Sequence, residues 1–175
     1  MVRLRQAGLD DLEPVRHILA AAADDLTARF GQGHWSGVRA METLQTHAVA
    51  GDLYVVEAAS IAVGALRLTE RKIGFYKQDW FARPEDPAGY LLDMAVHPAH
   101  QNRGVGRRAM QLAERVAQRA GLLAVRLDAY QGPAGAGDFY KKCGYTLVHS
   151  GEIRGIGLEY FEKLLPPPTP LSPSG

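Results

Sequence analysis

The residues best suited to chemistry lie between positions 100 and 108, where the sequence reads HQNRGVGRR. Gly104 and Gly106 let the backbone approach a ligand closely, and a helix that starts here presents free N–H groups with a partial positive charge. Cations are unfavourable at a helix start, yet no acid lies between Pro98 and Met110 to balance three arginines: Arg103, Arg107 and Arg108. This pattern predicts a bound anion, and a pyrophosphate would fit it.

A glycine-x-glycine pair alone is weak evidence, because two glycines can simply shape a turn while the arginines form a solvated surface. The segment is not a nucleotide P-loop, since it lacks the Gly-Lys-Ser/Thr ending that holds phosphate and magnesium. It also lacks the Gly-x-Gly-x-x-Gly fingerprint that binds dinucleotides in the first turn of a repeating strand–helix sheet. The turn-only interpretation stays open at this point.

A strand before this turn and a helix after it must position the glycines and arginines. Tyr90–Val96 is an apolar strand stopped by Pro98, and Gly104–Ala120 has apolar residues at helical spacing. Similar patterns predict strands at Val2–Gln6, Leu53–Glu57, Ile61–Leu68, Ala124–Tyr130, Tyr145–Ser150 and Ile156–Leu164, and helices at Leu12–Ala28, Val38–Ala50 and Asp138–Lys142. Only one strand–helix–strand crossover is evident, so we expect a mixed α/β sheet.

The composition predicts a cytoplasmic protein with one domain over residues 1–165 and a flexible Pro-rich tail over 166–175. Among 175 residues the formal net charge is only +1, which gives no basic excess for a nucleic-acid or membrane-surface partner. The single Cys143 excludes an internal disulfide framework, and no cluster of His, Asp and Glu has metal-binding spacing. No apolar run approaches the ~20 residues of a membrane span. Homodimer formation is left open.

Four segments follow one another in the second half of the chain: residues 93–98 (DMAVHP), 101–106 (QNRGVG), 139–145 (FYKKCGY) and 158–164 (LEYFEKL). In order and in spacing they resemble the GNAT superfamily of acetyl-CoA-dependent N-acetyltransferases. The first two are similar to a family strand that ends in a small-apolar pair and Pro, followed by Gln/Arg-x-x-Gly-x-Gly/Ala. The third resembles the family motif Leu/Phe-Tyr-x-x-x-Gly-Phe/Tyr, and the fourth resembles the final strand of the family. The N-terminal half of the chain matches the family only in layout.

The resemblance implies a single-domain GNAT-like fold of the α/β (α+β) type, with a central mixed, mostly antiparallel sheet that has a V-shaped splay and is flanked by helices. It also implies an acyltransferase of groups other than aminoacyl, with acetyl-CoA as cosubstrate and an amine as acceptor. The residues implied to bind acetyl-CoA are Met94, Ala95 and Val96, whose backbone would position the thioester, and Gln101, Asn102, Arg103, Gly104, Val105, Gly106 and Arg107, which would hold the pyrophosphate.

Amine acetylation needs a base, because an alkyl ammonium with a pKa near 10.4 loses its proton at a cost of about 4–5 kcal/mol at neutral pH. By resemblance, Tyr140 matches the family's frequent general acid for the CoA sulfur; the alternative is a packing tyrosine. Asp128 matches a position where some members carry a proton-relaying Glu; the alternative is an exposed strand residue. Asp93 lies near the expected reacting centre, where it could also orient the strand or bind the amine. Further candidates for the base are Glu57, Glu70 and Glu159.

One position departs from the family pattern. Many members carry an Asn seven residues before the Tyr, and this chain has Pro133 there. The contact with the cosubstrate must therefore come from the backbone or from Gln131, or be absent. This departure affects the fine geometry of the site and not the class of cosubstrate.

Aromatic residues in loops flank the expected acceptor side. Trp35, Tyr76 and Trp80 could line a substrate pocket there, or they could be buried as loop anchors. The function that we favour is acetyl transfer to the primary amine of a small molecule by direct attack. Acetylation of protein N-termini or lysines, and a non-catalytic acyl-CoA sensor on the same fold, are the alternatives.

Overall fold

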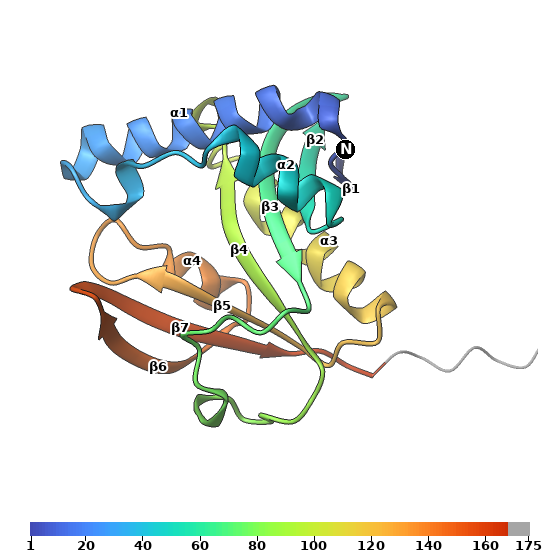
Figure 1. Ribbon diagram of the computed structural model, residues 1–175, viewed down its shortest axis with the longest axis vertical. Helices are drawn as coiled ribbons and strands as arrows, with labels where there is room; N and C mark the ends of the chain where they lie inside the picture. The colour runs from blue at the N-terminus through green and yellow to red at the C-terminus, as the bar shows by residue number, and fades with distance from the viewer. Residues whose placement is uncertain (168–175) are drawn as a thin grey trace, which may run out of the picture.

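The computed structural model describes residues 1–167, which form one seven-stranded sheet flanked by helices (Figure 1). The strands are β1 (Val2–Gln6), β2 (Leu53–Ala58), β3 (Ile61–Thr69), β4 (Ala88–Val96), β5 (Ala124–Tyr130), β6 (Thr146–Ile153) and β7 (Ile156–Leu164). They lie in the order β1-β2-β3-β4-β5-β7-β6, and all neighbours are antiparallel except the parallel pair β4 and β5. The predicted mixed, mostly antiparallel sheet is confirmed. Most of the predicted tail, residues 168–175, lies outside the described residues.

The two parallel strands diverge soon after they meet, which gives the sheet its V-shaped splay (Figure 1). Only Ala88–Tyr90 of β4 pairs with β5, against Ala124–Arg126. Within residues 1–167, β4 pairs beyond Tyr90 with β3 alone, while β5 pairs with β7 along its whole length. An unpaired strand edge presents free N–H and C=O groups, so the second half of β4 offers such an edge to the splay.

A β-bulge in β4 lies where the strands diverge. Arg67 of β3 pairs with Leu92, and Ala65 pairs with Ala95, so two residues of β4 stand opposite one residue of β3. Asp93 has a φ of 50°, in the left-handed region that Asp tolerates better than most residues. Since a bulge redirects the side chains near it, this irregularity sets the direction of the Asp93 carboxylate.

Helices cover both faces of the sheet. On one face Leu44 packs against Val55, and on the other Ala109 and Met110 pack against the strands. The helices of the first face are α1 (Leu12–Phe30) and α2 (Met41–Val49), and those associated with the second are α3 (Val105–Arg119) and α4 (Gly137–Lys142). Within residues 1–167, no helix combines the length and the apolar character needed to cross a membrane.

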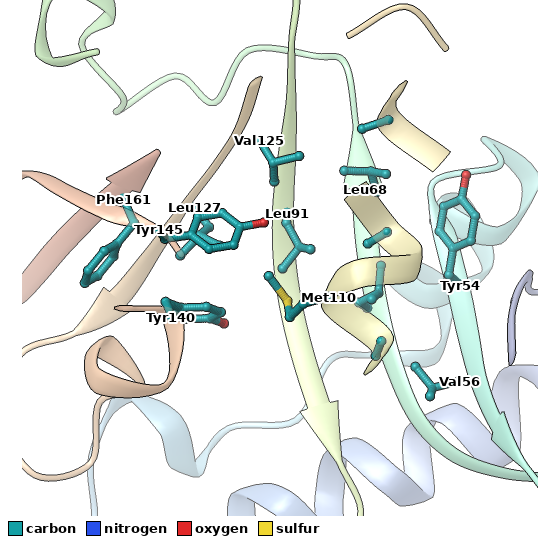
Figure 2. Packing of buried hydrophobic residues seen from close by; sticks show 14 of the residues in the cluster. Tyr54, Val56, Leu68, Leu91, Met110, Val125, Leu127, Tyr140, Tyr145 and Phe161 are labelled. Carbon is teal, nitrogen blue, oxygen red and sulfur yellow. The ribbon is translucent and has the colours of Figure 1, made fainter. Parts of the chain in front are cut away.

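The larger hydrophobic core lies between α3 and the sheet (Figure 2). It joins Leu68, Leu91 and Val125, from the three central strands, with Met110 of α3 and Tyr140 of α4. Full burial of one such apolar side chain contributes about 1.5–3 kcal/mol. This shared core holds α3 and α4 in fixed positions relative to the splay.

The irregular loop of residues 70–87 is fastened to the sheet by a buried ion pair. Nε of Arg126 donates to Oε2 of Glu162 at 3.0 Å, and the two side chains are only 1% and 3% exposed. The Arg126 guanidinium also donates to the Arg83 carbonyl at 2.7 Å, and Oε1 of Glu162 accepts from the Ala82 N–H at 2.9 Å. A buried ion pair needs such additional hydrogen bonds to offset its desolvation. The loop therefore has a defined position although it contains little regular structure.

One element boundary differs from the sequence prediction in a way that affects the site. α2 begins at Met41 and not at Val38, because Ala40 has an extended backbone (φ −63°, ψ 150°). Residues 37–40 are thus a connection outside the helix. This connection brings Arg39 to Asp93 of β4.

Candidate active site

The start of α3 holds a run of free backbone donors. The N–H groups of residues 102–107 make no hydrogen bond within residues 1–167, and the first to bond is that of Arg108, to the Gly104 carbonyl at 3.0 Å. Gly104 has a φ of 77°, and a Cβ built on it would have no neighbour within 4 Å. A side chain there would be strained and would project into open space. The start of α3 is therefore an accessible cradle of N–H donors, which suits a phosphate group.

Two contacts hold this cradle in place. The side-chain amide of Gln101 donates to the Val96 carbonyl at 2.9 Å and ties the turn to the end of β4. Gly106 lets α3 approach α4 closely, because a Cβ on Gly106 would lie 3.3 Å from the Phe139 ring. The cradle, the end of β4 and α4 consequently form one connected unit.

The arginines at the start of α3 carry charge that no acid in the described chain neutralises. None of the three forms a salt bridge there. Arg107 donates to the Lys142 carbonyl at 3.0 Å, at the C-terminal end of α4, and Arg108 donates to Gln111 at 3.2 Å. Arg103 is exposed. Three guanidinium groups and a helix dipole therefore favour an anion at the same place.

Tyr140 combines a buried ring with a hydroxyl that is free to donate. The ring is 6% exposed, and its centroid lies 6.0 Å from those of Tyr145 and Phe161. In Figure 2 it extends from α4 toward β4. The hydroxyl makes no hydrogen bond to the described residues, and burial, helped by the charge of Asp128, raises its pKa above the usual value. A tyrosine that stays neutral in this way can act as a proton donor.

Asp128 lies on β5 two residues beyond the last pairing with β4, at Arg126. Its carboxylate accepts a hydrogen bond from the hydroxyl of Tyr76, which comes from the 70–87 loop. Burial raises the pKa of Asp128, the hydrogen bond from Tyr76 lowers it, and the negative charge of Asp93 raises it. A carboxylate with a raised pKa is a stronger base, which suits proton removal from an amine.

Asp93 is held by two arginines and is not a free carboxylate. Arg39 donates to its Oδ1 from Nη2 at 2.7 Å and from Nε at 3.2 Å. Arg67 of β3 approaches Oδ2 with Nη1 at 3.5 Å. This pairing orients Asp93 and offsets its charge, so the geometry favours Asp128 over Asp93 as a base.

Comparison with protein-family models gives a match to the acetyltransferase (GNAT) family over residues 51–145, which is more than half of the chain. The chain belongs to the GNAT family. The matched range contains the bulge in β4, the cradle at the start of α3, Asp128 and Tyr140. None of the curated protein sequences compared with the chain matches it.

Solved structures of GNAT proteins have the same fold. A GNAT acetyltransferase from Listeria monocytogenes has a TM-score of 0.74 and 19% identity, over 94% of this chain and 95% of that one. The PaiA N-acetyltransferase of Thermoplasma acidophilum, solved with coenzyme A, has a TM-score of 0.69 and 16% identity, over 94% and 99%. YncA of Salmonella typhimurium, solved with its cofactor acetyl-CoA, has a TM-score of 0.69 and 16% identity, over 99% of both chains.

The aromatic residues expected near the acceptor of this GNAT protein lie in three different settings. Trp35 lies in a short 3-10 helix (η2, His34–Ser36) and forms a T-shaped pair with Tyr130 at the end of β5, with ring centroids 5.6 Å apart. Tyr76 is 4% exposed and reaches Asp128. Trp80 stacks on His149 of β6 at 3.9 Å, with an interplanar angle of 11°. Trp35 therefore lies beside the splay, Tyr76 supports Asp128, and Trp80 anchors its loop.

Other candidate residues of the family site also have defined surroundings. The side-chain amide of Gln131, in the loop that carries Pro133, donates to the Leu158 carbonyl of β7 at 3.2 Å. Glu57 pairs with Arg5 at 2.7 Å, away from the splay on the β1–β2 side. Among residues 1–167, no group of three or more His, Cys, Asp or Glu side chains is placed to hold a metal ion.

Sequence reasoning missed three residues of this candidate site: Arg39, Arg67 and Tyr130. Arg39 lies in a stretch that the pattern assigns to a helix, and only its backbone reveals the connection that carries it to Asp93. Arg67 is a single charge in an apolar strand, and such a charge inside a sheet signals a partner. Tyr130 ends β5 and carries no motif.

Proposed function

We propose that this GNAT protein transfers the acetyl group of acetyl-CoA to the primary amine of a small molecule, by direct attack of the amine. The observation that carries the proposal is the run of free N–H groups at residues 102–107, beside the unpaired edge of β4. A cradle for phosphates beside a strand edge that can pair with an extended chain fits the two halves of coenzyme A. Bound acetyl-CoA would supply a thioester carbonyl that is activated toward amines.

The donor side is formed by α3 and β4. The N–H groups of residues 102–107 would hold the pyrophosphate, while Gln101 fixes the turn through Val96. The free edge of β4 at Met94, Ala95 and Val96 would pair with the pantetheine arm and donate to the thioester oxygen. Donors that are already aimed at a developing negative charge lower the barrier without reorganisation.

The acceptor amine must lose a proton before it can attack, and Asp128 is the base that we propose. Its raised pKa makes proton transfer from an ammonium group less unfavourable than transfer to an ordinary carboxylate. The Tyr76 hydrogen bond fixes the orientation of the carboxylate. From α4, the neutral hydroxyl of Tyr140 would protonate the departing sulfur. Each proton then has a defined donor or acceptor atom.

Release of free thiol from acetyl-CoA, measured over a mixed panel of amines, tests this function, with Tyr140→Phe as the comparison variant. We expect amine-dependent release by the wild-type protein and a kcat lowered by about 10²–10⁴-fold in Tyr140→Phe, the range of general-acid effects. Thermal stabilisation by CoA without turnover of any amine would overturn catalysis in favour of a sensor. Turnover of peptides alone would overturn the small-molecule acceptor.

A further inference from the structure

Two arginines from different parts of the chain meet at Asp93, in the part of β4 that has diverged from β5. Arg39 comes from the connection before α2, and Arg67 lies near the C-terminal end of β3. Both contact Asp93, each at a different carboxylate oxygen. The side chain of Arg67 is 13% exposed and that of Arg39 is 52% exposed. The first is therefore a fixed part of the site, and the second can be reached from solvent.

The hydrogen-bonding capacity of this pair exceeds what Asp93 can accept. A guanidinium has five N–H donors. Within residues 1–167 the Arg67 side chain makes a single hydrogen bond, from Nη1 to Oδ2 of Asp93 at 3.5 Å. Nε of Arg67 is buried and has no hydrogen-bond partner there. Leaving a buried charged donor unpaired is unfavourable, so a bound acceptor atom would improve this site.

The charge around Arg39 and Arg67 also favours a bound anion. Two guanidinium groups face one carboxylate, and the next acid on this side, Asp52, is paired with Arg71 at 3.2 Å. His47 lies near both arginines, and burial followed by the charge of Arg67 lowers its pKa, so it is neutral at pH 7. The cluster of Arg39, Arg67 and Asp93 therefore has a surplus positive charge, which suits an anionic group.

The carboxylate of Asp128 is the negative counterpart of this cluster, and Tyr130 lies near both. Burial and then the charge of Asp128 raise the pKa of Tyr130, whereas the charge of Arg39 lowers it. The site thus has a negative end at Asp128 and a positive end at the two arginines. Trp35, which forms a T-shaped pair with Tyr130, adds an apolar surface. An α-amino acid has the matching features, an ammonium group, a carboxylate and a side chain.

We infer that the acceptor is an amine that also carries a carboxylate, as an amino acid does, and that Arg67 and Arg39 bind this carboxylate while Asp128 faces the amine. This inference rests on the proposed acetyl transfer and narrows its substrate class. It excludes diamines, whose second cation would meet two guanidinium groups. It also disfavours peptide N-termini, which have an amide in place of the carboxylate.

Matched sets of acceptors test the inference by thiol release from acetyl-CoA. Each set contains an L-amino acid, its amide and its decarboxylated amine, for example phenylalanine, phenylalaninamide and phenethylamine, or arginine, argininamide and agmatine. We expect kcat/KM to be at least ten-fold higher for the amino acid than for the other two members of the best set. Equal or higher values for the amides or amines would overturn the inference and leave acetyl transfer intact.

The variant Arg39→Gln connects the preference to the arginines. We expect it to lower the ratio of kcat/KM for the amino acid to kcat/KM for the amine by at least ten-fold, mainly through a higher KM for the amino acid. Arg67→Lys, which keeps a positive charge inside the sheet, is a second variant that should lower the same ratio. Arg71→Gln is the matched control, since Arg71 is 74% exposed and pairs with Asp52 outside the cluster. A ratio that stays at the wild-type value in Arg39→Gln and Arg67→Lys would overturn the assignment of the carboxylate site.

A binding measurement tests the inference without turnover. Calorimetric titration of the CoA-saturated wild-type protein with the best amino acid should give saturable binding, and Arg39→Gln should weaken this binding at least ten-fold. Absence of binding by every amino acid in the sets would overturn the inference. Thiol release with the decarboxylated amines in that case would show that the proposed acetyl transfer still holds.

Discussion

The hydroxyl of Tyr76 donates a hydrogen bond to the carboxylate of Asp128 and thereby joins the irregular 70–87 loop to the edge of the splay. The two residues are 52 positions apart in sequence. Tyr76 lies in a small aromatic core with Phe81, Tyr90 and Tyr160, so its ring is fixed before it meets the carboxylate. The 70–87 loop therefore positions the carboxylate of the proposed base, in addition to lying near the proposed acceptor site.

The variant Tyr76→Phe should shift the acid limb of the pH profile of kcat/KM to higher pH. The Tyr76 hydrogen bond lowers the pKa of Asp128, so its loss leaves burial and the charge of Asp93 to raise that pKa further. A carboxylate must be ionised to act as a base, and a higher pKa moves its ionisation to higher pH. Tyr160→Phe is the control, because the buried Tyr160 hydroxyl has no partner in the described chain. An acid limb that moves equally in both variants would rule out a specific role for Tyr76.

Asp128→Asn should lose activity and gain stability at neutral pH. The pKa of Asp128 is higher in the folded protein than in the unfolded chain, so the folded state loses stability as the pH rises from about 4 through the folded pKa. Asn removes this loss and can still accept the Tyr76 hydrogen bond. We expect a higher Tm than wild type at pH 7, a difference that disappears near pH 4, and a kcat lower by about 10²–10⁴-fold.

Asp138→Asn is the control for that measurement, since the Asp138 side chain is 90% exposed. Its Tm should follow that of the wild type at both pH values. If Asp128→Asn were less stable than wild type at pH 7, burial of the charged carboxylate would not be the dominant effect at this position.

Gly104→Asp should weaken CoA binding while the protein stays folded. Asp tolerates the left-handed conformation of Gly104 better than most residues, so the strain of the new side chain should cost about 1 kcal/mol and leave the protein folded. The new negative charge would oppose a pyrophosphate at the adjacent N–H groups. We expect at least a ten-fold rise in the Kd for CoA by calorimetry. Gly104→Asn, which has nearly the same shape and no charge, should bind CoA more tightly than Gly104→Asp, and equal Kd values would argue against an anion at this position.

Arg126→Met should destabilise the protein by about 3–5 kcal/mol, because it leaves the buried Glu162 carboxylate without its cation. The double variant Arg126→Met/Glu162→Leu removes both charges and should recover most of the free energy of unfolding. Urea unfolding measures both values. Equal destabilisation of the single and double variants would mean that the pair is not held together by charge. The double variant should still lose activity, because Arg126 also donates to the Arg83 carbonyl of the loop that carries Tyr76.

The cradle at the start of α3 could be predicted from the sequence because its signals are local. A glycine that needs a positive φ, a helix start and unbalanced arginines all lie within nine consecutive residues, and the structure brings them together as expected. The strand that leads into this turn was equally clear, since Pro98 stops it. Its bulge was not predictable, because the residues around Asp93 have no turn-forming pattern.

The acceptor side depends on contacts between distant segments, and the sequence does not reveal them. Arg39 meets Asp93 across 54 positions, and Arg126 meets Glu162 across 36. Tyr76 could be recognised as a loop aromatic, but its partner Asp128 lies on another strand. The expected helix start at Val38 concealed the connection that carries Arg39, because helical spacing of apolar residues continues through it.

Transfer of an isotopically labelled acetyl group from acetyl-CoA is the most direct test of the central claim. Mass spectrometry should find the label on the nitrogen of an amine acceptor with the wild-type protein, and much less of it with Asp128→Asn. Label found only in free acetate, or retained on CoA with every amine, would show that the cradle at α3 binds a cosubstrate whose acetyl group this protein does not transfer to amines.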